Sequence, residues 1–380
     1  MRLYYVRVLG PTGLSTPQTV EVNAEGAEAR DATGLVLSPG WMDLHAHLRE
    51  PGFPEKETML SGATSAAVGG FTHVLAMANT DPVTDRVDRL QNLLTRSEAL
   101  PIRISFVGAV TIGLEGRQLT DAVALKAAGA VALSDDGRHA IDRPMFGRAL
   151  DAAAAAGLPI LVHAQAEQLG DDPDAEAVAV ADVLAALRDV RGARLHIQHV
   201  STRAAVDLIR AAKSEGLPVT AEATPHHLAL SSRDVWAMGS HGNVNPPLRS
   251  PDDRDALCEA LVDGVIDAIA TDHAPHELAA KQAGANGFHG FETAVGVVLG
   301  LGLDGGTVYR ACVSRPREIL GQSLEDEWIL IDPDAEWRVD AASFKSRGKN
   351  TPFQGRRLRG RVLMTVCRGQ VVTERVMQHV

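Results

Sequence analysis

Eight short apolar runs recur along the middle of the chain, and a longer amphipathic stretch follows most of them. The runs are continuous rather than alternating, which is typical of strands buried on both faces of a sheet. They cover residues 37–48, 71–80, 102–110, 129–136, 158–165, 194–201, 217–227 and 265–276. The amphipathic stretches predict helices, among them residues 119–128, 143–156, 203–215 and 252–263.

Strand and helix alternate in this way over about 250 residues, which predicts a (β/α)8 barrel of the TIM type. An open, doubly wound sheet has the same alternation and is the alternative. Both ends of the chain depart from the rhythm and carry short β-like pieces instead. We therefore expect an α/β protein with a barrel domain at residues 37–321. A small β-sandwich-like domain would combine residues 1–36 with residues 322–380.

Composition narrows the class of protein. The chain has 380 residues, 45% of them hydrophobic, and a formal net charge of −11, so it is neither disordered nor a good non-specific binder of nucleic acid. No apolar run is long enough to span a bilayer, and the first residues lack the apolar core of a secretory signal. Three scattered cysteines fit a reducing compartment, so we expect a cytoplasmic protein.

The end of the first barrel strand carries the first candidate chemistry. His45 and His47 are two residues apart, so on a strand they point to the same face, with Asp43 behind them. Two neutral imidazoles at this spacing suit a cation such as zinc. A single His-x-His pair is equally consistent with two core or surface histidines.

Histidine and aspartate at further strand ends favour the metal site. The predicted strands end at Asp135-Asp136, His163, His199 and Asp272-His273. In a (β/α)8 barrel these ends meet at one mouth, where a metal would satisfy buried groups that are otherwise costly. Four histidines and two aspartates exceed the needs of one tetrahedral zinc, so two ions sharing a carboxylate are expected.

Five motifs resemble those of the dihydroorotases of the amidohydrolase superfamily, in the branch called type I. The resemblance covers residues 37–372, nearly the whole chain. The motifs are HLREPG (47–52), HVST (199–202), NPPLR (245–249), TDHAPH (271–276) and NTPFQG (350–355). It implies a zinc-dependent, reversible cyclisation of N-carbamoyl-L-aspartate to L-dihydroorotate and water, in de novo pyrimidine (UMP) biosynthesis.

The resemblance also implies which residues carry the chemistry. Asp136 would bridge two zinc ions, a choice over Asp135 that alternation in a buried strand cannot make. Related enzymes often use a carboxylated lysine as the bridge, but none of the six lysines lies at a predicted strand end. Asp272 would be both a ligand and the group that moves the proton. The implied metal ligands are His45, His47, Asp136, His163, His199 and Asp272.

Four further residues are implied in substrate binding. Arg49 would hold a substrate carboxylate, because a planar guanidinium pairs with it through two parallel hydrogen bonds. Asn79, Asn245 and His276 would contact the ring amides and the carboxylate. Of the remaining histidines, we expect His196, His226, His227 and His273 to be structural or to be outer partners of the metal ligands. Solvated side chains are expected at His73, His139, His241, His289 and His379.

Two segments depart from the family pattern. Where the family usually has His-x-Glu, residues 164–167 read Ala-Gln-Ala-Glu, which puts the local loop in doubt. Residues 279–290 are rich in glycine and alanine and follow the last barrel strand, so we expect a mobile lid there.

Two alternative functions and the possible associations of an active enzyme stay open. A hydantoinase or allantoinase would share the barrel and ligand layout, although the lysine bridge typical of them is missing. A non-catalytic scaffold for aspartate transcarbamoylase belongs to a different class, and such chains lose the ligands that this one keeps. An active enzyme could still form a homodimer or associate with that transcarbamoylase.

Overall fold

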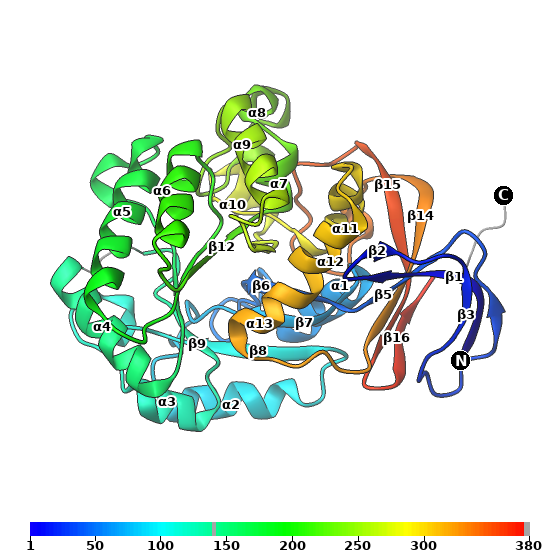
Figure 1. Cartoon of the computed structure of the whole chain (residues 1–380), viewed down its shortest axis with the longest axis horizontal. Coiled ribbons are helices and arrows are strands. Elements are labelled where there is room, and N and C mark those ends of the chain that lie inside the picture. Colours follow the sequence, from blue (N-terminus) through cyan, green and yellow to red (C-terminus); the bar gives the residue numbers. More distant parts are fainter. Residues whose placement is uncertain (139–141, 376–380) are drawn as a thin grey trace.

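The computed structural model describes residues 1–138 and 142–375, and a barrel of eight parallel strands lies at its centre (Figure 1). Neighbours in the barrel follow one another along the chain, from the first strand to the eighth. These strands are β6 (Trp41–Ala46), β7 (Phe71–Ala76), β8 (Arg103–Gly108), β9 (Ala132–Leu133), β10 (Ile160–Val162), β11 (Leu195–Ile197), β12 (Val219–Ala223) and β13 (Ala268–Ile269). Each falls inside one of the eight predicted runs.

Contacts between the first and last strands complete the barrel. The His47 N–H donates to the His273 carbonyl at 2.8 Å, and a parallel bridge joins Ala46 to His273. The buried Asp43 carboxylate on β6 accepts the Thr271 N–H, just beyond β13, at 2.9 Å. The predicted TIM-like barrel is confirmed, and the open doubly wound sheet is excluded.

Helices cover the outside of the barrel. Helix α4 shows how local sequence sets their bounds: the Asp142 side chain accepts the Met145 N–H at its start, and Gly157 ends it with a φ of 67°. The longer covering helices are α1 (Met59–Val68), α2 (Val87–Ser97), α3 (Ala122–Ala128), α4 (Arg143–Ala156), α5 (Asp174–Asp189), α6 (Arg203–Ser214), α9 (Pro251–Val262) and α11 (Phe291–Gly300). Shorter helices, α12 (Gly305–Tyr309) and α13 (Arg315–Leu320), follow α11.

Short helices occupy the loops that follow strands at the mouth of the barrel. In this fold the loops after the strands form the face that carries the active site. They contain η2 (Glu167–Leu169) after β10, α10 (Leu278–Gln282) after β13, and, after β12, α7 (Pro225–Ala229), α8 (Ser232–Met238) and η3 (Gly239–Gly242).

Both ends of the chain combine in a second, mixed sheet beside the barrel, as predicted (Figure 1). Its central path runs β16-β15-β14-β5-β1-β2, and β3 and β4 also pair with β1. The strands are β1 (Arg2–Gly10), β2 (Gly13–Leu14), β3 (Gln18–Glu21), β4 (Arg30–Asp31), β5 (Val36–Pro39), β14 (Trp328–Arg338), β15 (Arg357–Cys367) and β16 (Gln370–Glu374). The division into domains at the residue numbers given above stays a prediction.

The first predicted run, residues 37–48, holds two strands instead of one. Strand β5 pairs with β1 and β14 in the terminal sheet, and β6 opens the barrel one residue later. Gly40 separates them, and a Cβ built there would lie 2.0 Å from the Thr72 hydroxyl oxygen. Only glycine fits this close approach.

Among the residues that the structure describes, none of the helices has the length and apolarity needed to cross a bilayer.

Candidate metal centre

Six buried side chains from five strand ends converge at the mouth of the barrel. Their positions follow from the fold, because all eight parallel strands point their carboxyl ends to this face. They are the six predicted ligands: His45 on β6, His47 just beyond it, Asp136 beyond β9, His163 beyond β10, His199 beyond β11 and Asp272 beyond β13.

Asp136 lies between two groups of imidazoles. Its Oδ1 is 3.2 Å from Nε2 of His45, and its Oδ2 is 3.5 Å from Nε2 of His47. On the other side, Oδ1 lies 4.0 Å from both Nδ1 of His163 and Nε2 of His199. Each group, together with Asp136, presents ligand atoms within 4.8 Å of one another. The carboxylate is therefore placed to be shared between two ions.

Asp272 joins the first of these groups. Its Oδ1 is 3.2 Å from Nε2 of His47 and 3.7 Å from Nε2 of His45. Both contacts use the same carboxylate oxygen, so Oδ2 is left for another partner.

Asp135, the neighbour of Asp136, forms its hydrogen bonds with a loop and not with the imidazoles. Its carboxylate accepts the N–H groups of Val110 at 2.8 Å and Thr111 at 3.0 Å, and also the Thr111 hydroxyl. These bonds fix the loop after β8. Of the two neighbouring aspartates, Asp136 is the one that faces the imidazoles, and its role as the bridge stays a prediction.

Three site residues have a strained backbone. Arg49, His199 and Asp272 have φ values of 61°, 30° and 46°, in the region that residues with a Cβ rarely adopt. Each such residue costs about 1–3 kcal/mol and persists where the surroundings over-determine it. Backbone strain at three residues of the same barrel mouth is typical of a functional site.

Asn79 fixes the orientation of His47. Its Nδ2 donates to Oδ2 of Asp136 at 3.1 Å, since a carboxylate can only accept. Its Oδ1 then accepts the proton on Nδ1 of His47 at 2.9 Å, which leaves the lone pair on Nε2 facing the cluster. The structure thus gives Asn79 a positioning role, and its predicted contact with substrate stays a prediction.

Glu222, on β12, does the same for His45 and was missed by the sequence analysis. Its Oε1 lies 3.0 Å from Nδ1 of His45, and its Oε2 lies 3.0 Å from Nε2 of His196. Burial by itself raises the pKa of Glu222, but the hydrogen bonds from His196 and His45 lower it to about 2. A carboxylate inside an otherwise apolar strand, as in TAEA at residues 220–223, is the signal that could have revealed it.

Gln165 stands where the family usually has a carboxylate. Its Oε1 lies 2.9 Å from Nε2 of His163, which turns Nδ1 of that histidine toward the cluster. The amide oxygen therefore provides the acceptor that the departure from His-x-Glu removed. Asn245 completes the contact, donating from Nδ2 to Oε1 of Gln165 at 2.7 Å.

The residues present fit a pair of divalent cations. Nε2 of His45 is buried and has no hydrogen-bond partner among the described residues. Nδ1 of His163 and Nε2 of His199 face each other at 2.8 Å, an arrangement that a shared cation would satisfy. Burial, reinforced by His163 and His45, holds the pKa of His199 well below its usual range, so this imidazole is neutral, as a ligand must be. Imidazole with carboxylate is a donor set that suits zinc.

Arg49 and His276 lie together beside the cluster. Nε of Arg49 donates to the Pro275 carbonyl at 3.3 Å, and its Nη2 lies 3.3 Å from Nε2 of His276. Burial lowers the pKa of Arg49 to about 10, against the opposing charges of Asp272 and Asp136, so the guanidinium stays charged at neutral pH. Burial, followed by the charge of Arg49, lowers the pKa of His276 to about 3, so this ring is neutral and accepts.

Within residues 1–138 and 142–375, no carboxylate lies within 4.0 Å of the Arg49 guanidinium. A half-buried cation without a counter-ion is unfavourable, so the position suits an anionic ligand. Asn245 adds an unused acceptor: its Oδ1 is buried without a hydrogen-bond partner among the described residues.

Lys281 anchors the segment expected to be a mobile lid. Its side chain is fully buried, and its Nζ donates to the carbonyls of Gly287 at 2.7 Å and Ala285 at 2.9 Å, and to that of Asn243. Residues 279–290 are therefore tied both to themselves and to the loop that carries Asn245. The predicted lid motion stays a prediction.

The other histidines divide differently from the prediction. His196 is buried and bonded to Glu222, which also contacts His45, and His273 is buried and bonded to Glu57. His226 and His227 are buried as well. The solvated positions predicted for His73 and His289 are wrong, because both rings are buried against a serine hydroxyl, at 2.8 Å and 3.0 Å. His241 is half-buried, and His139 and His379 lie outside the described residues.

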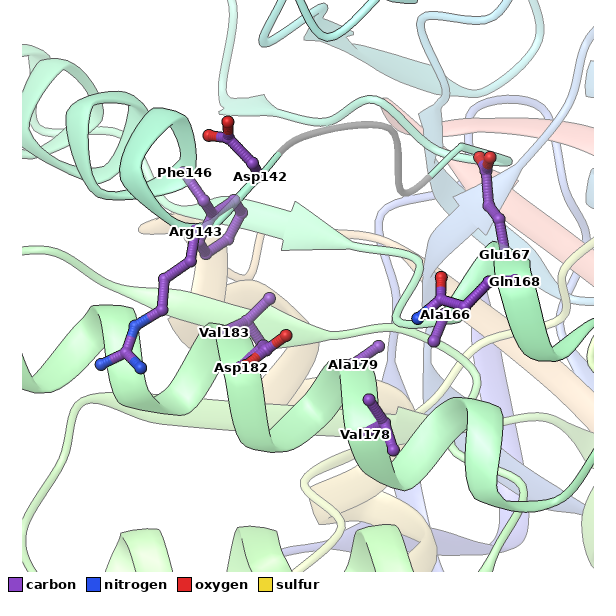
Figure 2. A pocket seen from close by; sticks show the side chains of 10 residues that line it. All are labelled: Asp142, Arg143, Phe146, Ala166, Glu167, Gln168, Val178, Ala179, Asp182 and Val183. Atoms are coloured by element: carbon purple, nitrogen blue, oxygen red, sulfur yellow. The ribbon is translucent and has the colours of Figure 1, made fainter.

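A separate cavity of about 450 Å³ lies between α4, η2 and α5 (Figure 2). Apolar and charged side chains alternate around it, and none of the predicted site residues lines it. Its lining consists of Asp142, Arg143, Phe146, Ala166, Glu167, Gln168, Val178, Ala179, Asp182 and Val183.

The amino-acid sequence is similar to a known family and to several known proteins. A family model described as dihydro-orotase-like matches residues 34–214. The chain is 44% identical to a dihydroorotase of Anaeromyxobacter dehalogenans over 92% of this chain and 88% of that protein. A dihydroorotase of Pelotomaculum thermopropionicum is 39% identical, over 93% of this chain and 90% of that protein.

A solved structure with the same fold is the L-hydantoinase (dihydropyrimidinase) of Arthrobacter aurescens. The TM-score is 0.89 at 25% sequence identity, with 100% of this chain and 97% of that chain covered. The barrel and the terminal sheet are thus common to this chain and to hydantoinases.

Proposed function

This chain belongs to the dihydroorotase family of amidohydrolases and is a hydrolase, and on that premise we propose that it interconverts N-carbamoyl-L-aspartate and L-dihydroorotate with release or uptake of water. The observation that carries the proposal is the half-buried guanidinium of Arg49, which has no carboxylate partner among the described residues and lies beside a cluster able to bind metal. Both substrate and product carry a carboxylate, which would supply the missing counter-ion. In the cyclic form, the carboxylate is a substituent of the ring that contains the scissile amide.

Two zinc ions are the proposed cofactors. His45, His47 and Asp272 would hold one ion, His163 and His199 the other, and Asp136 would bridge them. When bound, the pair would lower the pKa of a water molecule and polarise the ring carbonyl. Glu222, Asn79 and Gln165 contact the other ring nitrogen of three of these histidines and would thereby orient the free lone pairs for metal binding.

Asp272 is the proposed proton carrier. In hydrolysis, Oδ2 of Asp272 would accept the proton of the attacking water and pass it to the ring nitrogen as the C–N bond breaks. In cyclisation the same oxygen would take a proton from the carbamoyl nitrogen. The contacts of Asp272 to the two histidines use only Oδ1, which leaves Oδ2 for this transfer.

Arg49 would orient the substrate through its carboxylate. His276, neutral and in contact with Arg49, would contribute at the same end. Asn245 would meet the ring amides or carboxylate through its unused Oδ1, and Asn79 would contact the substrate beside the bridging aspartate.

The proposed reaction belongs to de novo pyrimidine (UMP) biosynthesis and to the cytoplasm. All of the proposed site residues belong to this chain. A homodimer and association with aspartate transcarbamoylase remain expectations of the resemblance.

Hydantoinase activity is the second candidate, because the structural likeness to an L-hydantoinase extends over the whole chain. Hydantoin and allantoin lack the carboxylate that Arg49 would bind. A hydrogen-bonded charge pair contributes about 1.5–3 kcal/mol, so kcat/KM is expected to be at least about tenfold higher for L-dihydroorotate.

Steady-state hydrolysis of L-dihydroorotate, hydantoin and allantoin by the zinc-loaded protein tests this order. A preference for hydantoin or allantoin would overturn the proposal. A purified protein that binds no metal and turns over none of the three would instead support the non-catalytic scaffold.

A further inference from the structure

Residues 344–350, here called the C-terminal strap, leave the terminal sheet and return to the mouth of the barrel. The strap follows η5 (Ala341–Ser343) between β14 and β15. Ser346 and Asn350 are almost fully buried, which is unusual for polar residues in a connection between two strands. The proposed chemistry gives the strap no role, although the NTPFQG motif begins at its last residue.

Glu57 joins the strap to two other segments. This fully buried carboxylate, between β6 and α1, accepts the Ser346 hydroxyl and the Arg347 N–H, the latter at 3.1 Å. Its Oε2 also lies 3.3 Å from Nε2 of His273, and its Oε1 accepts the Ser61 hydroxyl. One side chain therefore ties together the loop that carries Arg49, the end of β13 and the strap.

Gly348 packs directly behind the proposed carboxylate site. A Cβ built on it would lie 2.5 Å from Cβ and 3.0 Å from Cα of Pro275, and 3.3 Å from the His276 nitrogen. Pro275 accepts the Arg49 Nε–H through its carbonyl, and His276 contacts the same guanidinium. The strap thus forms the back wall for both groups that hold Arg49.

Asn350 fixes the far end of the strap. Its Nδ2 donates to the Gly287 carbonyl at 3.3 Å, and its own carbonyl accepts the His289 N–H at 2.9 Å. The strap is therefore held on both sides of Gly348, so an added methyl group there could not be relieved by moving the strap alone.

We infer that the C-terminal strap is a positioning element for the substrate carboxylate, with Glu57 and Gly348 acting through Pro275 and His276 on Arg49. The inference rests on the proposed function and adds that the terminal sheet completes the substrate site. Among the hydrogen bonds of the described residues, none joins the strap to the six proposed metal ligands. Disturbing the strap should therefore affect substrate binding and leave the metal in place.

Gly348→Ala is the direct test. The added methyl group should displace Pro275 and, with it, Arg49, and the KM for L-dihydroorotate should rise on the order of tenfold. The kcat should stay within about twofold and zinc content should not change, because a contact made equally in ground and transition states alters KM alone. Ser346→Ala, which removes a hydrogen bond to Glu57 without adding atoms, should raise KM in the same direction by less.

Gly296→Ala is the matched control. Gly296 lies in α11 and packs the barrel against the terminal sheet at another place, where its Cβ would lie 3.2 Å from the Gly360 carbonyl oxygen. Its variant should change thermal stability without changing KM. Steady-state kinetics, zinc content and thermal unfolding are measured for the wild type and all three variants.

The outcomes separate the two ideas. A zinc-loaded wild type that does not turn over L-dihydroorotate would overturn the proposed function. An active wild type, with Gly348→Ala folded and its KM unchanged, would overturn the role of the strap alone. Loss of zinc in Gly348→Ala, or an equal rise of KM in Gly296→Ala, would likewise contradict it.

Discussion

Replacement of Asp136 by alanine is expected to reduce L-dihydroorotate hydrolysis by at least about 10³-fold and to release metal from both halves of the cluster. Asp136 is the only side chain common to the two groups of ligands among the residues that the structure describes. Without the shared carboxylate, the group formed by His163 and His199 has no anionic ligand. A Lewis acid contributes several kcal/mol to such a reaction, and each 1.36 kcal/mol is a factor of ten in rate.

Asp135→Asn is the matched control for this experiment. The neighbouring carboxylate is equally buried, but it holds the backbone of Val110 and Thr111 and not the imidazoles. Its amide cannot accept all three hydrogen bonds, so stability should fall by about 1–3 kcal/mol while zinc content is retained. An Asp136→Ala protein that keeps both ions would show that the bridge is assigned to the wrong residue.

Replacement of Asp272 by asparagine is expected to lower kcat by about 10²–10⁴-fold, with a much smaller change in KM. The amide preserves the shape of the side chain, but it cannot take up the proton of the attacking water, and general acid–base catalysis is worth about that factor. Steady-state kinetics in both directions of the reaction, on protein whose zinc content is measured, provide the test. Near-normal turnover with metal bound would contradict the assignment.

The control lies on the same strand. Asp267 immediately precedes β13, at the end away from the mouth, where it is buried and bonded to Lys213 at 2.5 Å and Arg315 at 2.7 Å. Asp267→Asn should lower thermal stability without a selective loss of kcat. A comparable loss of kcat in both variants would indicate that any disturbance of β13 lowers kcat, and would contradict a specific role of Asp272 in proton transfer.

The sequence predicted the barrel because its periodicity is local. Runs such as residues 71–80 and 158–165 are rich in apolar residues, and each ends in a polar residue. Once the barrel is assumed, residues as distant along the chain as His45 and Asp272 must share one face. The convergence of the six candidate ligands could therefore be predicted, although neither pattern nor spacing gives their distances.

Sequence reasoning failed where the answer depends on side-chain direction or on packing between segments. A strand buried on both faces has no alternation to show which side chain points inward, so Asp135 and Asp136 could not be told apart. Glu222 could not be identified, because its role depends on side-chain contacts to His45 and His196, which are far away along the chain. The run at residues 37–48 hid two strands, because the break at Gly40 is set by its contact with Thr72.

Zinc content per chain, measured together with L-dihydroorotate hydrolysis before and after chelation, tests the central claim most directly. The cluster of four histidines and two aspartates should hold about two zinc ions in each chain. Chelation should abolish hydrolysis, and added zinc should restore both the metal and the activity. A metal-free protein that hydrolyses L-dihydroorotate at the full rate would contradict the account.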